Sequence, residues 1–196
     1  MKRTATVERA TKETSIKLTL NLDGRGNASV RTGIGFLDHM LTSLAKHARF
    51  DLDLTCEGDL HIDDHHTAED CALALGQALD QALADRAGVQ RFASAYAPLD
   101  ESLARAVVDL SGRPHAEIDL RLVRPNIADI ASENITHVFQ SLATASKTTL
   151  HIDLIRGHND HHKAEAAFKA LALALRQAVR IDGADPTSIP STKGVL

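Results

Sequence analysis

Residues 64–79 read DHHTAEDCALALGQAL, and residues 160–175 read DHHKAEAAFKALALAL. Both stretches carry two adjacent histidines, an alanine and a glutamate at the same offsets, and each continues into a segment rich in alanine and leucine. Two further blocks recur in the same order: His39–Ala45 matches His137–Ala143, and Leu22–Arg25 matches Leu110–Arg113. Matched blocks in one order indicate an internal duplication. We therefore divide the chain into halves at 1–90 and 91–181, followed by a tail at 182–196.

Each half has the same pattern of secondary structure. In the first half, apolar and polar residues alternate over 16–22 and over 50–56, which is typical of half-buried strands. Asp23-Gly24 predicts a hairpin turn after the first of these strands, with a longer loop containing Gly26 as the alternative. The rest of the pattern predicts a helix over 36–44 and a long helix over 65–86 that is closed by Gly88.

The second half predicts strands near 103–110, 115–122 and 148–155, with helices near 130–145 and 160–181. Strands and helices mix without regular βαβ alternation, so we expect an α+β fold with helices packed on mixed sheets. The helix over 65–86 is apolar on more than one side. One interpretation is a helix buried at the centre of the fold, another is that part of it packs against a second subunit, and the two are compatible.

The composition is that of a globular chain. Of 196 residues, 43% are hydrophobic and 24% are charged, which excludes disordered and fibrous classes. Aromatic residues make up only 3% and the net charge is -4, so we expect neither a nucleic-acid stacking platform nor a phosphate-backbone surface. We find no secretory signal pattern and no stretch apolar enough to span a membrane. Because we expect Cys56 and Cys71 to be reduced thiols, we predict a cytoplasmic protein.

Histidine is the unusual residue, with 11 copies placed unevenly. In each repeated stretch, the glutamate lies four residues after the first histidine and three after the second, so all three approach one helical face. Imidazole and carboxylate donors suit divalent manganese, iron, cobalt or zinc. Adjacent histidines point about 100° apart on a helix, so the doublets favour two metals or a dinuclear site. With one more matched histidine pair, eight candidate ligands form two equivalent sets: His39, His65, His66, Glu69, His137, His161, His162 and Glu165.

Ordinary explanations exist for each of these residues. Histidine doublets occur in solvated turns, a glutamate in a first helical turn is favoured by the helix dipole, and His39 fits an amphipathic helix. Recurrence of the same residue types at the same offsets favours metal binding. Asp63 and Asp64 either orient the first doublet or begin its helix. The histidines without a partner in the other half are assigned to strands, loops or the surroundings of the ligands: His47, His61, His115, His151 and His158.

Motifs along the whole chain closely resemble the monofunctional imidazoleglycerol-phosphate dehydratases of histidine biosynthesis. They are FLDHML (36–41), GDLHIDDHHTAED (58–70), APLDE (97–101), DLSGRP (109–114), GHNDHHKAEAAFKA (157–170) and PSTKGVL (190–196). The resemblance implies a duplicated ββαβα-type unit like that of ribosomal protein S5 domain 2, and trimers that build a 24-subunit shell. It also implies dinuclear Mn²⁺ sites between neighbouring subunits, with two ions per active site held by the eight candidate ligands.

The activity that the resemblance implies is dehydration of imidazole glycerol phosphate to imidazole acetol phosphate. The proton to be removed lies on a carbon with no adjacent carbonyl, so the imidazole ring must accept the electrons. Two metal ions that hold the ring as imidazolate allow this. A carboxylate moves the proton, and an acid protonates the departing hydroxyl. The resemblance gives this role to Glu13, with Glu165 and Asp100 as further candidates. Without the resemblance, Glu13 has the pattern of a solvated charge beside Lys12.

The phosphate of this substrate requires fixed cations, and the resemblance assigns it to Arg91, Arg113, Lys169, Ser191 and Lys193. Arginine suits bidentate contact with phosphate, whereas lysine acts as a point charge. Ordinary explanations again exist, because Lys169 lies four residues after Glu165 and can pair with it, and the tail has the composition of a flexible terminus. If the tail binds phosphate, we expect it to become ordered when substrate binds.

Two other classes of function fit paired His/Glu sites. A dinuclear metallohydrolase activates water and releases inorganic phosphate, and a metal-storage or structural shell binds metal without turnover. Four positively charged side chains favour the lyase, because metal storage alone does not require them: Arg91, Arg113, Lys169 and Lys193.

Overall fold

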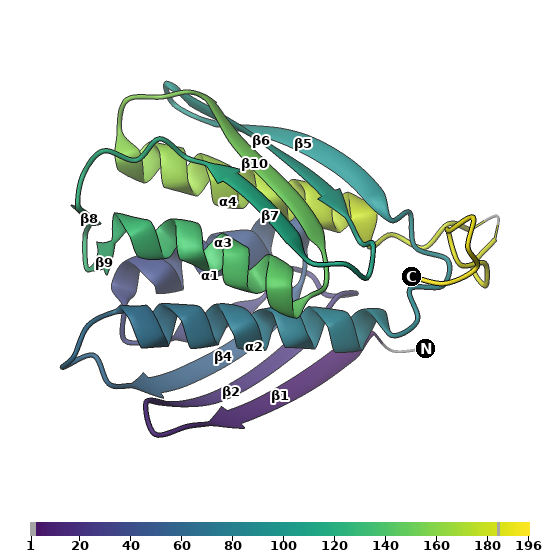
Figure 1. The fold of residues 1–196 in the computed structure, drawn as a ribbon, viewed down its shortest axis with the longest axis horizontal. Coiled ribbons are helices and arrows are strands. Elements are labelled where there is room, and N and C mark those ends of the chain that lie inside the picture. The colour runs from purple at the N-terminus through teal and green to yellow at the C-terminus, as the bar shows by residue number, and fades with distance from the viewer. Residues whose placement is uncertain (1–2, 184) are drawn as a thin grey trace.

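Two four-stranded sheets enclose the helices, as Figure 1 shows. The computed structural model describes residues 3–183 and 185–196. Met1, Lys2 and Ala184, which fall in the predicted first half and tail, lie outside the described residues. The helices of the first half pack on the first sheet and against the helices of the second half. The expected α+β fold with helices packed on mixed sheets is therefore confirmed.

The first sheet and its helices occupy residues 4–83. Their elements are β1 (Thr4–Ala10), β2 (Thr14–Asn21), β3 (Ala28–Arg31), α1 (Gly35–Ala48), β4 (Asp51–Gly58) and α2 (His65–Leu83). The strand order is β1-β2-β4-β3, in which β4 is antiparallel to β2 and parallel to β3. Every second side chain of β2 and β4 faces the helices, and Leu18 and Leu54 are completely buried there.

The second sheet repeats this arrangement. Its elements are β5 (Phe92–Leu99), β6 (Ser102–Asp109), β7 (His115–Asp119), α3 (Ser132–Ala145), β10 (Thr149–Arg156) and α4 (Asp160–Ala178), with a small sheet of β8 (Asn126–Ile127) and β9 (Ile130–Ala131) before α3. The strand order β5-β6-β10-β7 matches that of the first sheet element by element. β10 is parallel to β7, just as β4 is parallel to β3.

The structure contains strands that the sequence pattern does not predict: β1 and β3 in the first half, and β5, β8 and β9 in the second. Of these, β1 and β5 each lie at an outer edge of a four-stranded sheet and pair with β2 and β6. The buried residues of β1 are only Ala5 and Val7, and β5 contains three alanines and Pro98. Alanine and proline are depleted in strands, and an edge strand tolerates proline because one side of its backbone lacks a partner. Alternation of large apolar residues was therefore absent where these strands form.

The hairpin turn predicted at Asp23-Gly24 is wrong. β4 lies between β2 and β3, so residues 22–27 form a longer loop across the end of β4, which is the alternative with Gly26. The Asp51 carboxylate accepts hydrogen bonds from the backbone N–H groups of Arg25 and Asn27, both at 2.9 Å, and so holds this loop. Gly26 has φ 84°, and a Cβ atom there would lie 2.8 Å from the carbonyl oxygen of Lys46.

Both long helices end earlier than their apolar patterns. α2 ends at Leu83 instead of residue 86, and α4 ends at Ala178 instead of residue 181. Gly88 does not close α2. Its N–H donates to the carbonyl of Ser188 at 2.7 Å, and its carbonyl accepts from Asp182 at 2.6 Å. Gly88 therefore holds the tail against the chain between the two halves.

Other elements of the same chain pack against the apolar sides of α2. One side packs on β1 and β2, and another packs on α3, so α2 is a central buried helix. Packing of α2 against another subunit stays a prediction. In the second half, Phe139 of α3 and Phe168 of α4 are buried with ring centroids 4.4 Å apart. Among the described residues, none of the helices combines the length and the apolar character needed to cross a membrane.

Gly76 allows α2 and α3 to approach closely, and we predict that Gly76→Ala destabilises the fold. A Cβ atom there would lie 2.7 Å from both the Cβ of Ala145 and the carbonyl oxygen of Leu142. Overpacking costs about 1–3 kcal/mol, which exceeds the gain of about 1 kcal/mol in helix propensity. Thermal unfolding should show a melting temperature lowered by a few degrees. Gly183→Ala is the control, because nothing lies within 4 Å of a Cβ there; equal melting temperatures for both variants would contradict the prediction.

Candidate metal centres

Two groups of histidine and glutamate side chains lie where helices of the two halves meet. The α1/α4 group consists of His39, His161 and Glu165, and the α2/α3 group consists of His65, Glu69 and His137. In each group the candidate ligand atoms lie within 4.8 Å of one another. Each group joins a histidine from the short helix of one half to a His/Glu pair from the long helix of the other. The duplication thus produces two equivalent three-ligand sets from six of the eight candidates.

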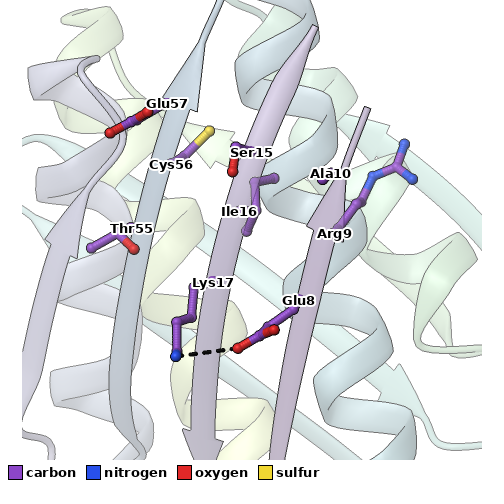
Figure 2. Close-up of a pocket in the computed structure, with 9 residues that line it drawn as sticks. All are labelled: Glu8, Arg9, Ala10, Ser15, Ile16, Lys17, Thr55, Cys56 and Glu57. Carbon is purple, nitrogen blue, oxygen red and sulfur yellow. Dashed lines mark ion pairs between the residues drawn. The ribbon is translucent and has the colours of Figure 1, made fainter. Parts of the chain in front are cut away.

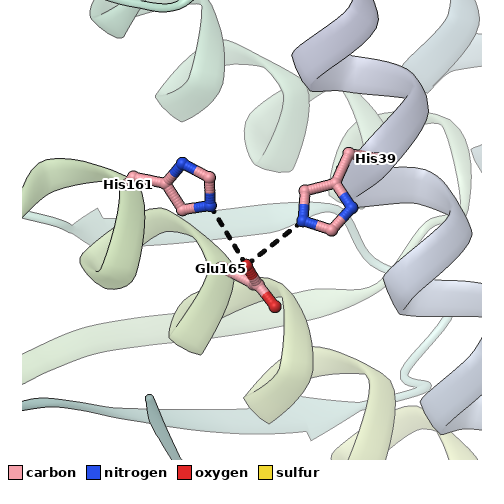
Figure 3. A group of neighbouring side chains, drawn as sticks. All are labelled: His39, His161 and Glu165. Atoms are coloured by element: carbon pink, nitrogen blue, oxygen red, sulfur yellow. Dashed lines mark hydrogen bonds and ion pairs between the residues drawn. The ribbon is translucent and has the colours of Figure 1, made fainter. Parts of the chain in front are cut away.

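Glu165 is the centre of the α1/α4 group (Figure 3). Its Oε2 atom lies 3.2 Å from the Nε2 atoms of both His39 and His161. Its Oε1 atom lies 2.7 Å from the ammonium group of Lys169. Partial burial opposes ionisation of Glu165, but the hydrogen bond and charge of Lys169, followed by His39, lower its pKa on balance. The Phe36 ring packs edge-on against His161, with centroids 5.1 Å apart.

The α2/α3 group is similar, but its carboxylate has no lysine partner in α2. Glu69 Oε1 lies 3.1 Å from His137 Nε2, and Glu69 Oε2 lies 3.8 Å from His65 Nε2. The two imidazole rings are stacked with centroids 5.0 Å apart. His137 Nε2 is buried, and no described residue offers it a hydrogen bond of acceptable geometry. A buried polar atom without a partner is costly, and a cation bound to its lone pair would remove that cost.

The donors of both groups fit a divalent transition metal. Each group offers two imidazole nitrogens and one carboxylate oxygen, the donor types that manganese, iron, cobalt and zinc accept. Three protein ligands also leave positions open for further donors, as catalytic sites require.

The second histidine of the first doublet faces different surroundings. His66 Nδ1 lies 3.0 Å from a carboxylate oxygen of Asp59, and its Nε2 lies 3.8 Å from Glu13. The hydrogen bond to Asp59 raises the pKa of His66. Because Nδ1 donates to Asp59, Nε2 keeps the lone pair of the neutral ring. His66 is not part of the α2/α3 group.

The second doublet repeats this arrangement. His162 Nδ1 lies 2.7 Å from Glu101, and its Nε2 lies 3.9 Å from Asp100. Glu101 also accepts the backbone N–H groups of Asn159 and His158, and these contacts together hold its pKa far below the usual range. The hydrogen bond to Glu101 raises the pKa of His162. The candidates Glu13 and Asp100 thus lie in equivalent hairpins, β1–β2 and β5–β6, each beside a histidine outside the three-ligand groups.

Asp63 and Asp64, which precede the first histidine doublet, have different contacts. Asp63 accepts the backbone N–H of His65, the first residue of α2, at 2.9 Å and so supports the start of the helix. Asp64 accepts the side-chain amide of Asn134 at 3.0 Å, and Asn134 contacts His65 Nδ1 at 2.9 Å. Sequence reasoning missed Asn134, Asp59 and Glu101. Only the position of Glu101 next to Asp100 could have drawn attention to it.

The candidate phosphate residues separate into two places. Arg91 Nε donates to Asp109 at 2.7 Å, and Arg91 Nη1 donates to the carbonyl of Pro190 at 2.8 Å, which places it beside Ser191. Arg113 is exposed and follows Gly112, against which the C-terminal Leu196 packs. Lys193 N donates to Ser191 Oγ at 3.2 Å. Arg91 and Gly112, which precedes Arg113, therefore both contact the tail that carries Ser191 and Lys193. Lys169 instead lies beside the α1/α4 group, paired with Glu165.

A hollow of about 470 Å³ lies away from these groups, on the first sheet (Figure 2). Residues of β1, β2 and β4 line it, and an ion pair between Lys17 and Glu8 at 3.2 Å crosses it. None of the eight candidate metal ligands lines this hollow. It is therefore separate from both metal groups.

Comparison with known proteins gives a consistent result. Residues 32–175 match the model of the family described as imidazoleglycerol-phosphate dehydratase. A Phytophthora nicotianae protein of that name is 62% identical over 194 residues, of whose length the chain spans 42%. The Zymomonas mobilis protein of that name is 54% identical over the full length of both chains.

Solved structures agree with these sequence matches. The imidazoleglycerol-phosphate dehydratase of Staphylococcus aureus has a TM-score of 0.83 and 34% identity, over 91% of this chain and 99% of that one. The Pyrococcus furiosus protein, solved in complex with (S)-C348, has a TM-score of 0.83 and 35% identity, over 97% of this chain and 100% of that one.

Proposed function

This chain belongs to the imidazoleglycerol-phosphate dehydratase family and is a hydro-lyase, and from that premise we propose that it dehydrates imidazole glycerol phosphate to imidazole acetol phosphate. The proposal includes two Mn²⁺ ions per active site, which hold the substrate ring as imidazolate. The observation that carries it is the pair of equivalent groups, each with two imidazoles and one carboxylate. We also propose that the enzyme acts in the cytoplasm, which suits the two unpaired cysteines, Cys56 and Cys71.

We propose that four side chains hold each cation, three from one chain and one from a neighbouring copy. The α1/α4 and α2/α3 groups each supply three ligands. We assign the fourth ligand to His66 and His162, because their Nδ1 atoms are engaged and neither histidine is part of a group in its own chain. Sites shared in this way link metal binding to self-association, in trimers that build a 24-subunit shell.

The reaction breaks a C–H and a C–O bond and releases water. When bound, two such cations supply Lewis acidity, which favours the imidazolate form of the substrate and orients its hydroxyl. We assign proton transfer to Glu13, whose carboxylate is half exposed and lies 3.8 Å from His66. Asp100 lies at the equivalent place beside His162, and Glu165 remains a candidate within the α1/α4 group. One of these groups must protonate the departing hydroxyl, because hydroxide is a poor leaving group.

We assign the substrate phosphate to the tail, with Ser191 and Lys193, and to Arg91, Arg113 and Lys169. Arg91 supports this by its contact with the carbonyl of Pro190, which brings a guanidinium to the base of the tail. Lys169 would have to share its ammonium group between Glu165 and the phosphate. Arginine and lysine together provide directional contacts and charge for a dianion.

The test is removal and restoration of metal. We expect chelation to abolish turnover and to shift sedimentation from the large particle to trimers or smaller species, and Mn²⁺ to restore both. Zn²⁺ and Mg²⁺ serve as comparisons, with metal content and products measured in each case. Release of inorganic phosphate would indicate a metallohydrolase, and bound metal without turnover would indicate storage. A full-size particle after complete metal removal would contradict ligands shared between subunits as a requirement for assembly.

A further inference from the structure

The two metal groups are equivalent by duplication, but the residues behind them differ. Three residues before the short-helix histidine stand Phe36 in α1 and Asn134 in α3. One residue before each doublet stand Asp64 and Asp160, and four residues after each glutamate stand Leu73 and Lys169. Only the pair of aspartates is identical. Because the ligands themselves match, any difference in metal affinity must arise from these surroundings.

Around the α2/α3 group, a chain of hydrogen bonds orients His65. The Asp64 carboxylate accepts a hydrogen bond from the backbone N–H of Ala131 at 2.8 Å. It lies 3.0 Å from the side-chain amide of Asn134. A carboxylate only accepts, so the Asn134 amide must present NH₂ to Asp64 and its oxygen to His65. That oxygen lies 2.9 Å from His65 Nδ1, which must therefore carry the hydrogen. The lone pair of His65 is left on Nε2, the atom that faces Glu69.

In the part of the protein that the structure describes, the α1/α4 group has no equivalent series of hydrogen bonds. Phe36 occupies the place of Asn134 and packs its ring on His161, so it offers no acceptor. Asp160 is engaged elsewhere: it pairs with Lys163 at 2.7 Å and accepts the backbone N–H groups of Val123 and Arg124. Neither residue fixes the tautomer of His161.

The carboxylates of the two groups also differ in charge balance. Glu165 is paired with Lys169 at 2.7 Å, and Leu73 at the matching position of α2 provides no such partner for Glu69. A cation entering the α1/α4 group must share Glu165 with an ammonium group. One entering the α2/α3 group meets Glu69, whose ion pairs with the described residues are both with histidines.

From these differences we infer that Asn134 and Asp64 are positioning residues that make the α2/α3 group the tighter metal site, which is filled before the α1/α4 group. The inference rests on the proposed function, because it requires both groups to bind a divalent cation. The inference adds the order in which the two groups bind their cations, and it assigns that order to residues that do not bind metal themselves. Hydrogen-bonded partners of metal-binding histidines are worth about 10–100-fold in metal affinity.

The experiment is titration of the metal-free full chain with Mn²⁺, at fixed chain concentration, with free Mn²⁺ measured by electron paramagnetic resonance. We expect two binding steps of unequal affinity. His137→Asn should remove the tighter step and His39→Asn the weaker one, which assigns each step to its group. Asn134→Leu should weaken the tighter step about 10–100-fold, so that the two steps merge.

Two matched variants separate positioning from folding. Asp64→Asn keeps the volume but also offers a donor, so it releases the orientation of Asn134 and should weaken the same step. Phe36→Leu, at the equivalent place in α1, should leave the tighter step unchanged. Two equal steps in the unsubstituted chain, or loss of the weaker step in His137→Asn, would overturn the inference while leaving the proposed function standing. Absence of Mn²⁺ binding would instead contradict the proposed function.

Discussion

Replacing Glu13 by glutamine should lower kcat by about 10²–10⁴-fold, the contribution typical of a general acid or base. The substitution removes a carboxylate but should leave the hairpin intact, because main-chain contacts hold it. The N–H of Glu13 donates to Thr11 Oγ1 at 3.1 Å, and its carbonyl accepts from Asp59 at 3.0 Å. Steady-state kinetics with the phosphorylated imidazole substrate measures the effect, with metal content and sedimentation as evidence that the particle is unchanged.

Glu8→Gln is the matched control. Glu8 lies on β1, close to the hairpin, and its exposed carboxylate pairs with Lys17 at 3.2 Å. An exposed pair of this kind contributes little, so kcat should stay within about twofold. If Glu13→Gln retains full kcat, Glu13 is a solvated charge and the assignment is wrong. Asp100→Asn then becomes the decisive variant, because Asp100 holds the equivalent place beside His162.

The duplicated residues explain why so much of the fold could be predicted. Repeated alternation and repeated Ala/Leu-rich helices identify β2, β4, α2 and their copies in the second half. The prediction failed where local pattern is weak. The buried residues of β1 and β5 are alanines and one valine, and the loop after Asp23 depends on Asp51, which is distant in sequence. Strand order is likewise a property of the whole sheet, so a turn signal alone could not place β4 between β2 and β3.

The candidate site shows the same limit. Spacing on one helix relates His65 to Glu69 and His161 to Glu165, since residues four apart share a face. It cannot show that His137 joins the first pair and His39 the second, because that depends on how α1 packs on α4 and α3 on α2. Nor could spacing identify Asn134, because its role depends on its contacts with Asp64 and His65 at the start of another helix.

Ending the chain after Ile189 should raise the KM about 100-fold or more. The deletion removes Ser191 and Lys193, and contacts with a charged group are worth about 1.5–3 kcal/mol each, where 1.4 kcal/mol is tenfold. The base of the tail should remain, because Gly88 donates to the Ser188 carbonyl at 2.7 Å. Lys193→Ala should reproduce part of the increase, and Thr192→Ala, an exposed neighbour, should not. An unchanged KM in the truncated enzyme would refute a role for the tail in phosphate binding.

A substrate analogue without phosphate distinguishes loss of phosphate contacts from disturbance of the site. Truncation also removes the Pro190 carbonyl that Arg91 Nη1 contacts and the Leu196 that packs on Gly112. If the tail acts only on phosphate, the full-length and truncated enzymes should bind the analogue with equal affinity, and the bidentate contact of Arg91 with Asp109 should keep that guanidinium in place. Weaker binding of the analogue by the truncated enzyme would show that the tail shapes the pocket itself.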